Sequence, residues 1–221
     1  MKWVKKQAEP TAFINWKSKA NEEWEPSYDT LQNPEKRALH EALLTEQGQV
    51  CCYCGRTISL LDSHIEHFRP QETREDLALA YVNLHASCIR EKSPGAPLHC
   101  GHAKGNDFDE GLVISPQDEN CERRFIYTSQ DGAIHPTDRD DASAMYMVSL
   151  LKLDVGFLRD RRSEALKAVF DDEFVGSASD AELTHLAMAY RAPDAAGRMT
   201  SFGHVLSRFA EQLLGRPIQA G

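Results

Sequence analysis

The chain has 221 residues, of which 41% are hydrophobic, and it carries a formal net charge of -9 at pH 7. We expect one composite domain at this length, and no apolar run approaches the roughly 20 residues that a membrane-spanning helix needs. The negative charge is the wrong sign for a protein that binds a polyanion over a broad surface by itself. A nucleic-acid-binding protein of this composition needs basic surface from a local patch, a bound divalent cation or a partner.

The first residues, Met1 to Lys6, lack the apolar stretch that follows the charged start of a signal peptide, so we expect a cytoplasmic protein with no membrane partner. A reducing compartment keeps thiols free. The six cysteines therefore favour metal binding or buried thiols over disulfides.

The N-terminal part is predicted to contain one clear helix. Residues 1–32 are read as an irregular or partly helical arm. Asn33-Pro34-Glu35 is typical of a helix start, with Asn33 as the cap, and the apolar spacing that follows predicts an amphipathic helix over 34–47 that Gly48 ends.

The chemistry is concentrated between Val50 and about Leu112, where short strands, turns and loops are expected. This stretch carries five of the six Cys and five of the nine His. Within it, Ser93 to Pro97 is a loop by composition, because two Pro and a Gly sustain neither a helix nor a central strand.

After the turn signal Asp131-Gly132 the pattern predicts helices to the end of the chain. Ser179 and Glu182 form a capping-box pattern that starts one of them, and Gly215 is expected to end the last. The apolar positions that define the helices are Tyr146, Leu150 and Leu153; Val155, Leu158, Leu166, Val169 and Phe170; Leu183, Leu186, Ala187 and Tyr190; and Phe202, Val205, Leu206, Phe209 and Leu213.

Cys51 and Cys54 have the spacing of a zinc knuckle, in which one tight turn brings two thiolates to a tetrahedral ion. Cys88 and Cys100 are the natural second pair, with His99 or His85 as substitutes. Their separation is unusual, so the proline-glycine loop must bulge out between them. Two further cysteines are interpreted as buried free thiols: Cys52 and Cys121.

Between the cysteine pairs lies Ser63-His64-Ile65-Glu66-His67-Phe68-Arg69-Pro70, followed by Asn83 and by Cys100-Gly101-His102-Ala103-Lys104-Gly105-Asn106. In order and spacing these elements resemble the HNH (ββα-metal) endonuclease motif. The resemblance implies His67 as general base, Glu66 as ligand of Mg²⁺ or a similar divalent ion, Asn83 as the residue that fixes the loop, and His102 as the ligand from the helix.

One departure concerns the helix ligand. In the commonest HNH form it directly follows the last cysteine, where this chain has Gly101, so His102 or His99 remains open for this role. His64 alternates with Glu66 on a strand and is a further candidate ligand. Lys104 is either a phosphate contact or a solvated lysine at the helix end.

A narrower resemblance covers most of residues 33–172 and fades towards both ends. It is to the HNH nuclease subunit of the Septu anti-phage system, also found beside retrons. This implies an ABC-type, SMC-like ATPase partner that supplies the basic surface the acidic chain lacks. The segments that carry it are Thr45-Glu46-Gln47, Cys51-Cys52-Tyr53-Cys54, Ile65 to Pro70, Asn83-Leu84-His85-Ala86-Ser87-Cys88, His99 to Asn106 and Leu150-Leu151-Lys152-Leu153-Asp154, with Leu158 and Arg162.

The sequence therefore predicts an α+β, mainly α fold, in which a small HNH core with a structural zinc is flanked by helices. The expected parts are an arm and helix over 1–49, the nuclease core over 50–130, and a helical region over 131–221 that docks the partner. The expected function is a metal-dependent endonuclease that cuts DNA in phage defence. The alternatives are a nuclease that cuts RNA such as tRNA, or an inactive zinc-stabilised binding module.

Overall fold

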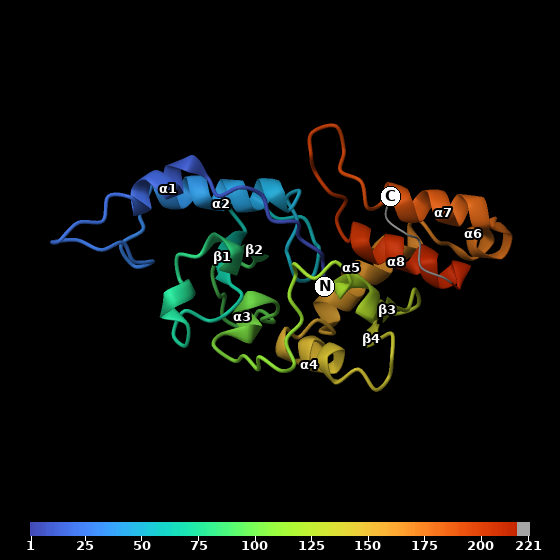
Figure 1. Ribbon diagram of the computed structural model, residues 1–221. Helices are drawn as coiled ribbons and strands as arrows, with labels where there is room; N and C mark the ends of the chain where they lie inside the picture. Colours follow the sequence, from blue (N-terminus) through green and yellow to red (C-terminus); the bar gives the residue numbers. More distant parts are fainter. Residues whose placement is uncertain (216–221) are drawn as a thin grey trace.

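The computed structural model describes residues 1–215 and shows a mainly helical α+β fold with two small antiparallel sheets (Figure 1). The helices are α1 Thr11–Lys17, α2 Glu35–Glu46, α3 Gly101–Lys104, α4 Ala142–Leu150, α5 Gly156–Lys167, α6 Asp172–Ser177, α7 Asp180–Ala189 and α8 Gly203–Leu214. The strands are β1 Ser63–His67, β2 Leu84–Cys88, β3 Phe125–Tyr127 and β4 Ile134–Pro136, and short 3₁₀ turns cover Glu75–Leu77, Tyr81–Asn83 and Cys121–Arg124.

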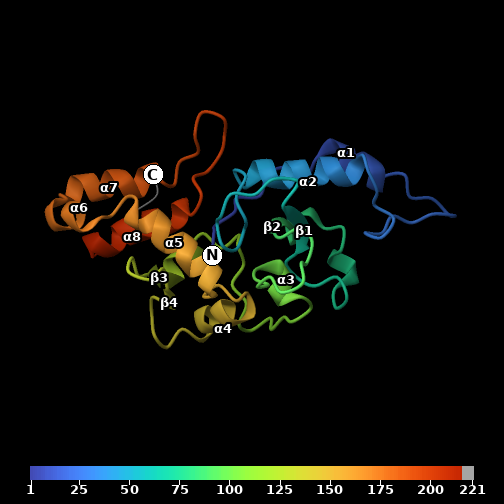
Figure 2. The same ribbon diagram turned by 180° about the vertical axis from the view of Figure 1, so that it is seen from behind.

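The N-terminal half is built around the pair β1–β2, with α2 packed on one side and α3 on the other (Figures 1 and 2). The amphipathic pattern explains α2, because Leu39, Leu43 and Leu44 lie in the core. The predicted helix is confirmed, but Asn33 as its cap is wrong. Pro34 occupies the cap position, and no side chain among the described residues caps the helix there.

Strand alternation sorts the side chains of β1 onto two faces. His64 pairs with Ser87 and Glu66 pairs with His85 across the ladder, so these residues share the face that meets α3. Ile65 lies on the opposite face, towards α2. Because β1 pairs only with β2 in the described part of the chain, its other edge is open.

The prediction that the chain is helical throughout after Asp131-Gly132 is wrong for its first residues. Ile134–Pro136 form β4, which pairs with Phe125–Tyr127 of β3. The Asp131-Gly132 signal is the turn of this hairpin. Gly132 is needed there because it has φ +67°, and an added Cβ would lie 2.0 Å from the Arg159 carbonyl oxygen.

The remaining C-terminal prediction agrees with the structure in outline. The capping box is present at α7, where the Ser179 and Glu182 side chains each accept a backbone N–H. α8 ends at Gly215 in the left-handed conformation, and its buried face includes Val205 and Phe209. The short helix α6 was not predicted as a separate element.

Backbone hydrogen bonds join the C-terminal helical region to the N-terminal half. The Cys100 N–H donates to the Leu151 carbonyl at 2.8 Å, and the Phe202 N–H donates to the Gly55 carbonyl at 2.7 Å. One hydrophobic core contains residues from both parts. Among residues 1–215, no helix combines the length and apolar character needed to cross a membrane.

Candidate metal and catalytic site

Four buried cysteine side chains meet where the two halves join. The Sγ atoms of Cys51, Cys54, Cys88 and Cys100 all lie within 4.8 Å of one another. A tetrahedral zinc ion with bonds of about 2.3 Å holds its sulfur ligands about 3.8 Å apart, and the Cys54 and Cys88 sulfurs are 3.8 Å apart. The predicted set of four is brought together, and it fits a structural zinc.

The alternative ligands lie beside this cluster. The Nδ1 atom of His99 is 3.5 Å from the Cys88 sulfur and 3.2 Å from the Cys100 sulfur, a suitable position for donating a hydrogen bond to thiolates. His85 is fully buried, and neither ring nitrogen has a hydrogen-bond partner within residues 1–215. Cys52 and Cys121 are buried and free, and burial raises the pKa of Cys121 to about 12, as expected for an inert thiol.

Glu66 is a buried carboxylate at the centre of a second cluster. Its Oε1 atom accepts a hydrogen bond from the Tyr53 hydroxyl and forms an ion pair with Lys104 Nζ, and both distances are 3.1 Å. Its Oε2 atom is 3.3 Å from His64 Nε2. Burial alone would raise the pKa of Glu66, but the His64 hydrogen bond and the Lys104 charge lower it, so the group is ionised.

His64 directs an unshared electron pair at this carboxylate when it is neutral. Its Nδ1 atom is 2.6 Å from the Ile89 carbonyl oxygen. A carbonyl only accepts, so Nδ1 carries a proton. Nε2 donates to Glu66 Oε2 when the ring is protonated, and it is an acceptor that faces Oε2 when the ring is neutral. Two acceptors at 3.3 Å repel unless a cation or a second proton lies between them. Although burial lowers the pKa of His64, its contacts with Glu66 raise the net value.

His102, on α3, lies beside His64. Its ring centroid is 4.4 Å from that of His64, and its Nε2 atom is buried without a hydrogen-bond partner in the described part of the chain. Gly101 occupies the position that directly follows Cys100, the last of the four clustered cysteines, and its backbone lies close to Glu66 and His64. A Cβ at Gly101 would lie 2.3 Å from Glu66 Oε2 and 2.8 Å from His64 Nε2, so only glycine fits beside the cluster.

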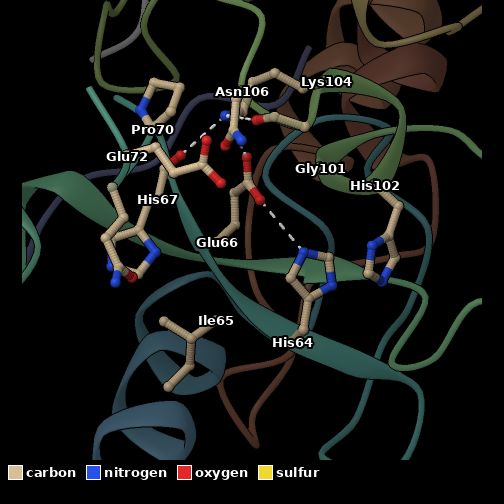
Figure 3. Close-up of a pocket in the computed structure, with 12 residues that line it drawn as sticks. His64, Ile65, Glu66, His67, Pro70, Glu72, Gly101, His102, Lys104 and Asn106 are labelled. Carbon is tan, nitrogen blue, oxygen red and sulfur yellow. Dashed lines mark hydrogen bonds and ion pairs between the residues drawn. The ribbon is translucent and has the colours of Figure 1, made fainter. Parts of the chain in front are cut away.

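His67 lies on the other side of Glu66 from His64 and His102 (Figure 3). Its Nε2 atom donates to the Ala78 carbonyl at 3.0 Å, which leaves Nδ1 as a proton acceptor. Its ring makes an edge contact with Tyr28 at a centroid distance of 4.4 Å. Burial lowers the pKa of His67, so the ring is neutral near pH 7, as a general base must be.

Asn83 fixes the loop that orients His67. Its Oδ1 atom accepts from the Arg69 N–H at 2.8 Å, and its Nδ2 atom donates to the carbonyls of Arg69 at 3.0 Å and Leu77 at 3.3 Å. The next residue, Ala78, holds the His67 ring. The amide therefore ties both ends of the loop to the residue that directly precedes β2, which agrees with the loop-fixing role that the family resemblance implies.

Lys104 differs from both expectations for it. It is buried, and its Nζ atom contacts Glu66 and donates to the carbonyls of His67 at 3.0 Å and Gly105 at 3.1 Å. It is therefore neither solvated nor free to bind a phosphate. Sequence patterns gave no signal for this contact or for that of Tyr53, because both depend on tertiary packing.

These side chains border an open cavity of about 350 Å³ that is also lined by Pro70, Glu72 and Asn106 (Figure 3). His64, Glu66 and His102 line one side of it, and His67 lines the other. Carboxylate and imidazole are ligand types that suit a divalent metal ion, but within residues 1–215 the four cysteines are the only group of at least three such residues whose ligand atoms all lie within 4.8 Å of one another. The molecule thus has a four-cysteine cluster near an acid-histidine centre. Cys51 and Cys54 come from the turn before β1, Cys88 from the end of β2 and Cys100 from the residue before α3, while the acid-histidine centre comes from β1 and α3.

The comparisons with known proteins agree with this class of site. No family model matches the chain. Over 104 residues, or 46% of this chain, it is 31% identical to the "Retron Vc95 putative HNH endonuclease" of Vibrio cholerae serotype O1 biovar El Tor. The match covers 48% of that protein, so the chain spans about half the length of this relative. The predicted resemblance to HNH endonucleases, including one associated with a retron, is confirmed by this similarity.

Proposed function

We propose that this protein is a metal-dependent HNH endonuclease that hydrolyses phosphodiester bonds in DNA. The observation that carries the proposal is the placement of His67 and Glu66. The ring of His67 is held as a proton acceptor on one side of the ionised Glu66, while His64 and His102 converge on the other side. The named relative adds support for a nuclease.

In this mechanism His67 Nδ1 accepts a proton from the attacking water, while its Nε2–H stays bound to the Ala78 carbonyl. Glu66, His64 and His102 would hold a divalent cation, Mg²⁺ or a transition metal, which stabilises negative charge on the phosphate and the leaving oxygen. Lys104 holds Glu66 in place through Oε1, so that Oε2 remains directed at the cavity. Asn83 keeps His67 aligned through the loop.

The cysteine cluster has a positioning role in this proposal. Cys88 ends β2 and Cys100 immediately precedes α3, so a zinc ion there would fix β2, and with it the paired strand β1 that carries Glu66 and His67, relative to the helix carrying His102. The ion would hold the two sides of the catalytic centre at a constant separation. Its part is structural, because all four ligands come from the protein.

We further propose that the protein acts in anti-phage defence with an SMC-like ABC ATPase. The supporting observations are the resemblance to the Septu nuclease subunit, the retron named in the relative, and the net charge of -9, which favours a partner that supplies basic surface. The helical region from residue 131 onward is the proposed docking part. Co-purification with the product of the neighbouring gene tests this association.

The test of the nuclease function compares His67→Ala with the wild-type protein on DNA and on RNA, with and without Mg²⁺ or Mn²⁺. We expect cleavage to fall by about 10² to 10⁴ when the general base is removed, with zinc content and folding retained. The exposed His135 on β4 offers the matched control His135→Ala. Unchanged function in His67→Ala would support the binding-module alternative, and cleavage of RNA alone would identify the other substrate.

A further inference from the structure

A second cavity adjoins the catalytic centre along the open edge of β1. It has a volume of about 460 Å³ and shares His64 and Ile65 with the catalytic cavity, so the two cavities meet at this strand. The remaining lining residues come from the N-terminal arm, α2, the turn before β1 and the segment after β2: Tyr28, Asn33, Lys36, Arg37, His40, Leu60, Leu61, Ser63 and Arg90.

The charge of this lining is opposite to that of the chain. It contains three basic side chains, Lys36, Arg37 and Arg90, and no Asp or Glu, whereas the whole protein has 34 acidic and 25 basic residues. Arg37 pairs with Glu41 on the surface of α2. Within residues 1–215, however, neither Lys36 nor Arg90 forms an ion pair, so both charges are available to an anion.

The cavity is also connected to the general base. Lys36 Nζ lies 4.7 Å from the centroid of the Tyr28 ring, and that ring also makes an edge contact with His67. The Tyr28 ring therefore lies between His67 and an anion bound at Lys36.

The lining offers apolar contacts besides these charges. Leu61 is 82% exposed at the turn before β1, so its side chain is accessible to a bound molecule. Tyr28, which also lines the cavity, supplies an aromatic ring. A nucleotide presents the matching chemistry, because it combines a phosphate with an apolar face on its sugar and base.

We propose that this cavity binds the nucleotide next to the scissile phosphodiester, with Lys36 and Arg90 contacting its phosphate and with Tyr28 and Leu61 against its sugar or base. The inference rests on the nuclease function proposed above and assigns a substrate contact to residues outside the HNH motif. It also identifies a local basic surface in an acidic chain. Basic surface on a partner protein would extend this nucleic-acid-binding surface beyond the cavity.

The test measures binding of labelled single-stranded DNA, duplex DNA and single-stranded RNA in the His67→Ala background without added divalent cation. We expect Lys36→Gln and Arg90→Gln each to weaken binding about tenfold and to reduce the slope of log K against log salt concentration by about one. Lys36→Arg should restore most of the affinity. The charge-matched controls Lys167→Gln and Arg139→Gln change exposed residues of the C-terminal part and should leave both values unaltered.

Lys36 is the decisive position, because Arg90 also donates to the Leu60 carbonyl at 2.7 Å and its loss can disturb the turn. A loss with any of the three nucleic acids supports the inference and identifies which of them occupies the cavity. If Lys36→Gln binds all three as the controls do, the inference is wrong. The proposed function is judged separately, by whether the protein with native His67 cleaves at all.

Discussion

His64 Nε2 and Glu66 Oε2 face each other across 3.3 Å, and the other ring nitrogen of His64, Nδ1, donates to the Ile89 carbonyl. In the neutral ring, two acceptor atoms therefore point at one another. A divalent cation between them would remove the repulsion and bind both. This relationship makes His64 a ligand in the proposed metal site, although it lies outside the acid-histidine pair that defines the motif.

The first prediction concerns the metal preference that His64 creates. Imidazole ligands favour transition metals such as Ni²⁺, whereas Mg²⁺ prefers oxygen. We expect His64→Ala to weaken the apparent affinity for Ni²⁺ by at least about tenfold, and to change that for Mg²⁺ less. The measurement is the concentration of each metal that gives half-maximal cleavage.

The control for this prediction is His185→Ala, which removes an exposed imidazole on α7 far from the cluster in sequence. It should leave both metal titrations unchanged. Equal losses for Ni²⁺ and Mg²⁺ in His64→Ala would mean that the ring only holds Glu66 by a hydrogen bond. In that case it is a positioning residue.

The second prediction concerns the close approach of α3 to β1. In Gly101→Ala the new methyl group would lie 2.3 Å from Glu66 Oε2 and displace the carboxylate, so we expect loss of most cleavage activity. The first residue of α5 offers a matched control, since a Cβ at Gly156 meets no atom within 4 Å. Gly156→Ala should keep full activity and be neutral or slightly stabilising. Cleavage assays and urea unfolding of both variants measure these effects. Full activity in Gly101→Ala would contradict the close approach of Gly101 to the Glu66 carboxylate.

Local signals in the sequence were sufficient for several elements. The Asn33-Pro34-Glu35 start and apolar spacing placed α2 within a residue or two, and the Ser179-Glu182 pair marked the start of α7. The spacing of Cys51 and Cys54 identified one half of the cysteine cluster. Each of these features depends on neighbours within a few positions, which is where sequence patterns carry information.

Other features depend on tertiary contacts and could not be predicted in this way. The orientation of His67 is set by the Ala78 carbonyl, and the burial of Lys104 by the Glu66 carboxylate. The hairpin β3–β4 was missed because its strands have only three residues each, too few to show alternation. Its Asp131-Gly132 turn was the available signal, but it was interpreted as a boundary before helices.

The third prediction tests the amide that fixes the catalytic loop. Asn83→Ala removes one acceptor and two donations to carbonyl oxygens, so we expect the free energy of unfolding to fall by about 1 to 3 kcal/mol. Because His67 loses its alignment through Ala78, kcat should fall while KM changes little. Steady-state cleavage kinetics and urea unfolding measure the two effects.

Asn15, exposed on α1, is the control for this substitution, since its side chain makes none of these contacts. Asn15→Ala should leave stability and kcat unchanged. A variant at Asn83 that lost stability but kept kcat would show that the loop is held without it and that His67 is aligned by its neighbours alone.

The last prediction concerns the cysteine cluster. Four sulfurs within 4.8 Å predict one zinc ion per chain in the purified protein, measurable by elemental analysis. Cys88→Ala removes a ligand between β2 and the segment leading to α3, so we expect loss of the zinc, of cooperative unfolding in this half, and of cleavage, because a structural ion contributes its binding free energy to folding. Cys121→Ala also changes a buried thiol, but one outside the cluster, and should retain the zinc despite a lower stability from the smaller side chain. If Cys88→Ala retained a full equivalent of zinc, the ion would be bound at another site. The four-cysteine cluster would then not be what holds α3 in place.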